Sequence, residues 1–181
     1  LRMSRGLGDV YKRQGQQELI EGILQRKDVL GIMPTGAGKS LCYQGPALML
    51  DGITIVVSPL ISLMTDQVKA LNQTGVHAAY INSSLTENQI RTALFYAAQG
   101  RYKIIYVAPE RLNTMRFLEF ACQVDISMVT VDEAHCISQW GQDFRPSYVG
   151  IADFLAQLPK RPVVSAFTAT ATERVCLLYT S

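Results

Sequence analysis

The sequence predicts an α/β fold, a three-layer αβα sandwich in which a mainly parallel sheet lies between two layers of helices. Six short apolar runs, rich in valine and isoleucine, alternate with longer segments of helical periodicity. Nearly continuous apolar runs are typical of strands buried on both faces of a parallel sheet. A glycine-rich turn that opens a helix follows the first run. Together these features favour a domain of the P-loop type.

The six apolar runs are the predicted strands, and the segments between them are the predicted helices. The strands are expected at 28–33, 53–58, 77–81, 103–108, 126–131 and 162–167. The helices are expected at 16–26, 38–50, 60–74, 86–99, 111–121 and 147–158. Thr86 and Gln89 have the spacing of a capping box, and Gly75 and Gly100 are suitable helix stops.

Composition limits the class of protein. The chain has 181 residues, of which 48% are hydrophobic and 18% charged, so we expect a globular domain with a sizeable core. It has no long apolar run and no apolar signal-peptide core, so neither a membrane span nor secretion is expected. Its four cysteines form no C-x-x-C pair. We expect reduced thiols in a cytoplasmic protein.

The two terminal segments, 1–14 and 176–181, do not continue the adjacent patterns and resemble translated adapter sequence. Both are predicted to be non-native, which leaves 15–175 as the predicted domain. Residues 1–14 hold four basic residues and one acid; removing their +3 from the formal net charge of +2 leaves −1 for the rest. Net charge therefore gives no support for nucleic-acid binding, which has to be argued from specific residues.

The stretch MPTGAGKS, residues 33–40, predicts a site for a nucleoside triphosphate. A glycine-rich turn before a helix presents backbone N–H groups and the positive end of the helix dipole to phosphate. Lys39 would reach the β- and γ-phosphates, and Ser40 would bind Mg²⁺. The predicted nucleotide-binding residues here are Thr35, Gly36, Ala37, Gly38, Lys39 and Ser40. The alternative is an ordinary glycine-containing turn, although strand, turn, Gly-Lys-Ser and helix all coincide.

Two consecutive acids follow the strand predicted at 126–131. Asp132 would contact the Mg²⁺ shell, and Glu133 would orient or deprotonate the attacking water. Two acids favour hydrolysis with water over the phosphate transfer to a small-molecule acceptor that a P-loop kinase performs. Two alternatives compete: the acids could charge the first turn of a helix, or His135 could bind zinc. No second histidine or cysteine pair completes a zinc site.

The segment after these acids carries Trp140, Phe144 and Arg145. Aromatic and guanidinium planes can stack on bases, at about 1–3 kcal/mol per base and without sequence preference. A protein that moves along nucleic acid of any sequence would therefore be served by such side chains. The alternative is that Trp140 and Phe144 only anchor the segment against the core.

Five stretches resemble motifs I, Ia, Ib, II and III of RecQ-family DNA helicases and occur in the family's order. They are MPTGAGKSLCYQ, VVSPLISLMTDQV, YVAPERL, VDEAHCISQWGQDFRPSY and SAFTATAT. The resemblance implies the first RecA-like lobe of a superfamily 2 helicase. Such enzymes hydrolyse ATP with Mg²⁺, move 3′ to 5′ along single-stranded DNA and unwind duplex DNA in repair and recombination. For a bacterial member, the resemblance implies the cytoplasm or nucleoid.

The resemblance also implies roles for individual residues. Lys39, Asp132 and Glu133 would be catalytic, and Gln16 would recognise adenine. DNA contact, or its coupling to hydrolysis, would involve His135, Gln139, Trp140, Phe144, Arg145, Thr168 and Thr170. Gln142 stands where the family often has histidine, for which we expect tuning rather than loss of function.

The motif Ia stretch combines predicted DNA contacts with predicted core. Ser58 and Pro59 would line the DNA-backbone side of the lobe on the same resemblance, whereas the alternative for Pro59 is simple strand termination. Leu60, Leu63 and Met64 are predicted to be core residues.

The family's second lobe, whose arginine finger completes the ATP site, is not in this sequence. The chain alone is therefore predicted to bind nucleotide weakly, with little ATPase activity and no unwinding. Two other classes remain open: an RNA-directed D-E-x-H helicase, which would share the ATP site, and a non-catalytic nucleotide- or DNA-binding fragment. The sequence indicates neither an oligomeric state nor a preferred DNA structure.

Overall fold

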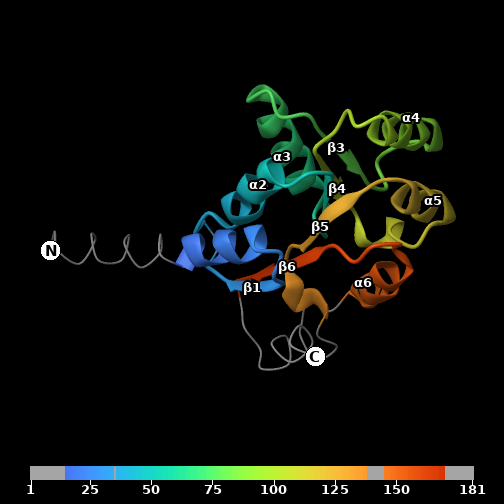
Figure 1. The fold of residues 1–181 in the computed structure, drawn as a ribbon. Coiled ribbons are helices and arrows are strands. Elements are labelled where there is room, and N and C mark those ends of the chain that lie inside the picture. Colours follow the sequence, from blue (N-terminus) through green and yellow to red (C-terminus); the bar gives the residue numbers. More distant parts are fainter. Residues whose placement is uncertain (1–14, 35, 138–144, 170–181) are drawn as a thin grey trace, which may run out of the picture.

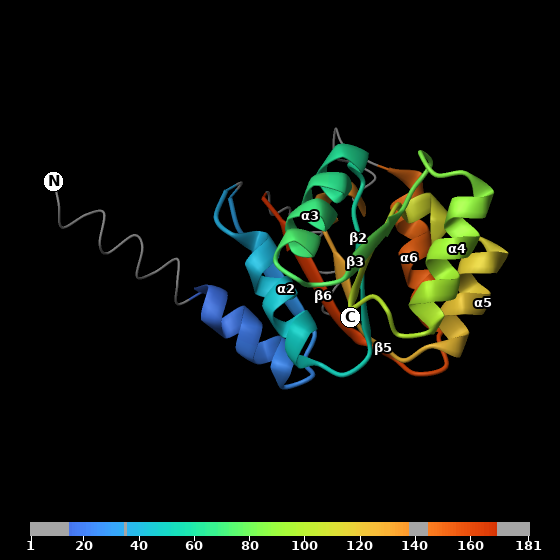
Figure 2. The ribbon, with the colours of Figure 1, turned by 90° about the horizontal axis from the view of Figure 1, so that it is seen from above.

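The computed structural model describes residues 15–34, 36–137 and 145–169, and these form the predicted three-layer α/β arrangement. One six-stranded sheet lies between two layers of helices, as Figures 1 and 2 show from two directions. The segments 1–14 and 176–181 lie outside the described residues, so their non-native origin stays a prediction.

The sheet is parallel throughout, with the strand order β1-β6-β5-β2-β4-β3. Its strands are β1 Val29–Ile32, β2 Ile53–Val57, β3 Ala78–Ile81, β4 Ile104–Val107, β5 Ile126–Val131 and β6 Val163–Thr168. Every residue of β2, β4, β5 and β6 is buried. The continuous apolar runs correctly predicted these strands, because both faces of the sheet are covered.

The helices form the two outer layers. They comprise the helical residues 15–24, α2 Lys39–Met49, α3 Ile61–Gln73, α4 Glu87–Ala98, α5 Met115–Gln123 and α6 Pro146–Gln157, with short 3₁₀ turns η1 Pro109–Arg111 and η2 Ala134–Ile137. Figure 2 shows α2 and α3 on one face of the sheet and α4, α5 and α6 on the other. Among the helices described, none has both the length and the apolar character needed to cross a bilayer.

Local signals account for the start of α4 and for the ends of α3 and α4. The capping box is present: Gln89 N donates to Thr86 Oγ1 over 3.3 Å, and Thr86 N donates to Gln89 Oε1 over 2.8 Å. Gly75 and Gly100 follow helix ends with φ of 86° and 74°, the left-handed region that glycine adopts at least cost.

The largest error in a predicted boundary is at the start of α5. The helix expected from residue 111 begins instead at Met115, because Pro109 starts a separate 3₁₀ turn. Thr114 is extended, with φ −71° and ψ 140°, and its hydroxyl donates to Arg111 O. The turn and the extended residue together delay the helix by four positions.

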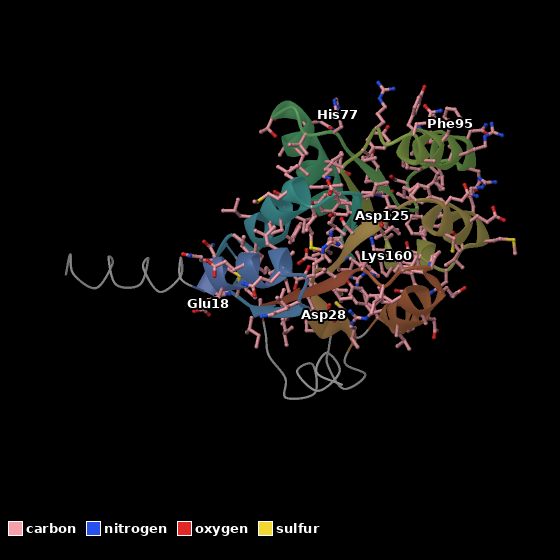
Figure 3. The ribbon with its side chains drawn as sticks, in the orientation of Figure 1. Glu18, Asp28, His77, Phe95, Asp125 and Lys160 are labelled. Carbon is pink, nitrogen blue, oxygen red and sulfur yellow. The ribbon has the colours of Figure 1, made fainter. Side chains whose placement is uncertain are left out.

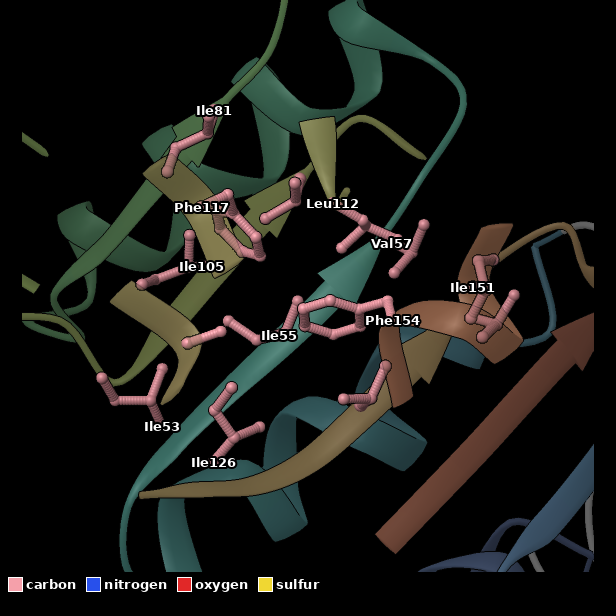
Figure 4. Close-up of a cluster of buried hydrophobic side chains, with 14 of the residues drawn as sticks. Ile53, Ile55, Val57, Ile81, Ile105, Leu112, Phe117, Ile126, Ile151 and Phe154 are labelled. Carbon is pink, nitrogen blue, oxygen red and sulfur yellow. The ribbon is translucent and has the colours of Figure 1, made fainter. Parts of the chain in front are cut away.

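Two hydrophobic clusters, one on each face, hold the layers together. The first packs β-sheet side chains against α4, α5 and α6, and part of it is shown in Figure 4. Phe117 of α5 and Phe154 of α6 meet in it with ring centroids 5.8 Å apart. The second cluster packs the other face against residues 15–24, α2 and α3. The sheet is therefore fixed from both sides, and its carboxyl edge is a rigid support.

The core prediction for motif Ia is only partly correct. Met64 is fully buried, Leu63 is half-buried, and Leu60 is 44% exposed. Leu60 precedes the first turn of α3 as its N-cap residue, so it lies beyond the part of the helix that packs on the sheet. Its assignment to the core was therefore wrong.

A charged clamp joins β1 and β6 at the amino edge of the sheet. Asp28, labelled in Figure 3, accepts hydrogen bonds from Val164 N over 2.9 Å and from the Arg161 guanidinium. Partial burial opposes the charged form of Asp28, but the bonds from Arg161 and Val164 outweigh it and hold the pKa of the carboxyl below its usual value. The carboxylate thus stabilises the fold above the usual aspartate pKa, and this contribution is lost as pH falls through the lowered value.

We expect Asp28→Asn to lower the free energy of unfolding by about 0.5–1 kcal/mol at neutral pH, since the charge-assisted bonds are lost. The difference from wild type should shrink as the pH becomes acidic, because wild-type Asp28 is then protonated too. Urea unfolding at several pH values measures this. Asp153→Asn, at an exposed position on α6, is the control, and a difference that persists unchanged into acid would contradict the clamp.

Candidate active site

The site is built where three neighbouring strands end. β6 lies between β1 and β5, so the carboxyl ends of all three meet at one edge of the sheet (Figure 1). The glycine-rich turn follows β1, the two acids follow β5, and Thr168 is the last residue of β6. Ligands of open parallel sheets bind at this edge.

The glycine-rich turn has the backbone of a phosphate loop. Gly36 and Gly38 both lie in the left-handed region, with φ of 78° and 79°. A Cβ on Gly38 would lie 2.8 Å from Gln16 Nε2, so a larger residue would displace the end of the Gln16 side chain as well as strain the left-handed backbone. Gln16 Nε2 donates to Ala37 O over 2.6 Å. Gly38, the N-cap residue of α2, has no side chain with which to cap the helix, which leaves this helix end suited to an anion.

Lys39 and Glu133 form the central ion pair. Lys39 Nζ lies 3.1 Å from Glu133 Oε1, and the two side chains are only 13% and 22% exposed. Glu133 has φ of 51°, in the left-handed region, which costs a non-glycine residue about 1–2 kcal/mol. A strained residue held by its surroundings is a reason to suspect function.

The second oxygen of Glu133 faces His135, which in turn reaches Thr168. His135 Nδ1 lies 3.2 Å from Glu133 Oε2 and 3.1 Å from Thr168 Oγ1. The carbonyl of Thr168 accepts from Met33 N over 2.9 Å, at the start of the phosphate loop. The structure therefore brings together Lys39, Glu133, His135 and Thr168 in one chain of contacts.

Asp132 lies beneath this chain and is 6% exposed. Its N–H donates to Val57 O over 2.9 Å, and its Oδ1 accepts from Glu133 N over 3.0 Å. Burial, reinforced by the charge of Glu133, raises the pKa of Asp132, while Lys39 opposes the rise. A buried carboxyl whose charged form is disfavoured gains from a nearby cation, so Asp132 suits a divalent metal ion.

Sequence reasoning missed a partly buried polar network that includes residues of α2, the helix that follows the phosphate loop. Gln44 Nε2 donates to Gln67 Oε1 over 2.8 Å and to the Tyr106 hydroxyl over 2.9 Å, and the Tyr43 hydroxyl lies 3.4 Å from that of Tyr106. The network joins α2, α3 and β4. These residues lie in three of the five helicase-like stretches, and a polar residue inside an apolar stretch was the signal that could have found them.

The remaining predicted residues are placed less completely. Arg145 is exposed, and its Nη1 donates to Pro59 O over 3.2 Å, so it contacts the motif Ia segment. Ser58 is buried, with 1% exposure, and Ser40 is half-buried in the first turn of α2. Five predicted residues lie outside the described ranges: Thr35, Gln139, Trp140, Phe144 and Thr170.

Comparison with known families identifies the class of protein. The DEAD/DEAH box helicase model matches residues 13–178, and the chain belongs to this family. Curated relatives are ATP-dependent DNA helicases named RecQ. The Bacillus subtilis protein is 51% identical over 164 residues, covering 90% of this chain and 28% of that relative. The Haemophilus influenzae protein is 46% identical over 159 residues, covering 88% and 26%.

These relatives confirm the predicted resemblance to RecQ helicases, although the chain spans under a third of their length. A solved structure described as a hypothetical ATP-dependent RNA helicase from Sulfolobus tokodaii has a similar fold. Its TM-score is 0.70 at 22% identity, covering 92% of this chain and 50% of that one. At this identity the likeness concerns the fold alone, and it confirms the predicted RecA-like architecture.

We expect Gln44→Leu to lower the free energy of unfolding by about 1–3 kcal/mol, because the buried Tyr106 hydroxyl loses a donor. Gln73→Leu, at an exposed position at the end of α3, should change it little. If the network acts as a unit, Tyr106→Phe should cost less in the Gln44→Leu background than in wild type. Urea unfolding of wild type, Gln44→Leu, Tyr106→Phe and the double variant tests this, and equal costs in both backgrounds would contradict it.

Proposed function

We propose that this chain is the ATP-binding first lobe of a RecQ-type DNA helicase, with residues 15–175 as the lobe. The complete enzyme would couple ATP hydrolysis to 3′–5′ movement on single-stranded DNA and to unwinding. The observation that carries the proposal is the chain of contacts from Lys39 through Glu133 and His135 to Thr168, because it connects the predicted phosphate site to motif III.

The residues at the carboxyl edge fit a magnesium nucleotide. The left-handed glycines and the open N-terminus of α2 would hold the phosphates, and Gln16, bonded to the loop, would meet the adenine. Ser40 and the buried Asp132 would hold Mg²⁺. When bound, the metal ion neutralises charge on the phosphate oxygens.

Glu133 is proposed as the base that activates water. A polyphosphate would compete with Glu133 for the Lys39 ammonium, since both are anions within reach of one cation. If the Lys39 ammonium paired with a phosphate instead, Oε1 of Glu133 would be able to accept a proton from water. Oε2 would still face His135, so the carboxylate would keep its orientation.

The DNA side of the proposal rests on the edge beside this site. Arg145, which follows Trp140 and Phe144 in the sequence, donates to Pro59 O of motif Ia. Stacking on bases suits movement along any sequence. Single-stranded and duplex DNA are the proposed partners, and the RNA-directed alternative shares the ATP site.

Lys39→Ala should weaken binding of ATP with Mg²⁺ by about tenfold or more, because a charge-assisted bond to phosphate is lost. Lys69→Ala, exposed on α3, is the matched control and should bind like wild type. Calorimetry or a fluorescent ATP analogue measures both. Unchanged affinity in Lys39→Ala would remove the phosphate loop from the proposal.

In a complete helicase containing this lobe, Trp140→Ala should leave ATP affinity near wild type and reduce DNA-stimulated hydrolysis and unwinding. The 181-residue chain alone should bind ATP weakly and turn it over slowly, so the complete enzyme is the place to test coupling. ATPase assays with single-stranded DNA and RNA of matched sequence provide the comparison. Stronger stimulation by RNA would favour the RNA-directed alternative. Normal DNA-stimulated hydrolysis and unwinding in Trp140→Ala would mean that Trp140 only packs against the protein.

A further inference from the structure

Tyr148 of α6 is buried, and its hydroxyl contacts the backbone of the acidic motif. The residue is 1% exposed, and its O–H donates to the carbonyl oxygen of Asp132 over 2.9 Å. Burial raises the pKa of Tyr148 far above its usual value, so the phenol stays protonated and remains a donor. A phenylalanine would fill the same space in the core without this bond.

The Asp132 carbonyl, which Tyr148 contacts, lies between the end of β5 and the left-handed residue Glu133. β5 ends at Val131, and Glu133 turns into the left-handed region directly after Asp132. The N–H of Asp132 is already held by Val57 O, and its Oδ1 by Glu133 N. The bond from Tyr148 therefore holds the carbonyl of Asp132, while Val57 holds its N–H. A shift of the peptide that joins Asp132 to Glu133 would move both acids.

The start of α6 is also tied to the acidic motif and to motif Ia. Arg145 N donates to Cys136 O over 3.0 Å, and Tyr148 N donates to Arg145 O over 2.9 Å. The guanidinium of Arg145 donates to Pro59 O. The residues that precede and follow 138–144 are thus bonded to each other, and the following side is bonded to Asp132 through Tyr148.

We infer that Tyr148 is a positioning residue of the hydrolysis site, which holds the Asp132 peptide in register with the first turn of α6. This rests on the proposed function, in which Asp132 holds Mg²⁺ and the segment before α6 responds to DNA. Tyr148 then ties the first turn of α6 to the acids, separately from the chain connection through η2. A purely packing role would need only the ring, not the hydroxyl.

Tyr148→Phe separates the two roles, because it removes only the hydroxyl. Binding of a fluorescent ATP analogue with Mg²⁺ should weaken about fivefold, because Asp132 is then less preorganised to hold the metal ion. Binding in EDTA should be unchanged, since Asp132 acts through the metal ion. Trp140 is the single tryptophan of the chain, so its emission reports on the connected segment, and its response to Mg²⁺·ATP should shrink in the variant.

Lys103→Met is the matched control. It removes side-chain bonds to the carbonyls of Leu50 and Gly52 at the opposite edge of the sheet, and it should leave nucleotide binding and Trp140 emission unchanged. Wild-type Mg²⁺ dependence and emission in Tyr148→Phe would reduce Tyr148 to packing and overturn the inference.

Amide hydrogen exchange distinguishes failure of this inference from failure of the proposed function. Exchange across 132–137 should rise in Tyr148→Phe with or without nucleotide, because the Asp132 carbonyl loses its donor. A wild-type chain that binds no ATP would defeat the proposed function, and exchange would still decide whether Tyr148 holds the peptide. Unchanged exchange across 132–137 would overturn the inference by itself.

Discussion

The carboxylate of Glu133 is the group on which the rest of the site depends. One of its oxygens faces Lys39 at 3.1 Å and the other faces His135 at 3.2 Å, so it joins the phosphate loop to the end of β6. This position requires a left-handed residue two positions after the end of a buried strand. Such a conformation persists only where neighbours hold it, and Val57 and Tyr148 hold the preceding residue from two sides.

The sheet supplies the rigidity that these contacts need. Burial of β2, β4, β5 and β6 along their whole length leaves no room for one strand to slide, because a slip would expose apolar side chains and leave others without space. The charged clamp at Asp28 fixes β1 to β6 at the opposite edge. The phosphate loop and Thr168 therefore start from strands whose relative position is set by the core.

The sequence predicted the strands to within about a residue at each end, because short continuous apolar runs are typical of strands that are buried on both faces of a parallel sheet. The phosphate loop was equally easy to predict from the sequence, since its residues are consecutive. The pairing of Lys39 with Glu133 spans 94 positions and depends on β6 lying between β1 and β5. No local sequence pattern predicts this strand order. Leu60 was misplaced for a related reason: its neighbours are core, but it precedes the packed turns.

The described residues on either side of 138–144 are connected to the paired acids in two ways, and the chemistry of the two connections differs. The upstream route follows the chain, where Cys136 N donates to Glu133 O within η2. The downstream route crosses space, from Arg145 to Tyr148 and then to the Asp132 carbonyl. A chain-following route transmits any displacement, whereas a hydrogen bond transmits only those small enough to keep it intact. The Tyr148 bond therefore restricts how far the Asp132 peptide can shift relative to the first turn of α6.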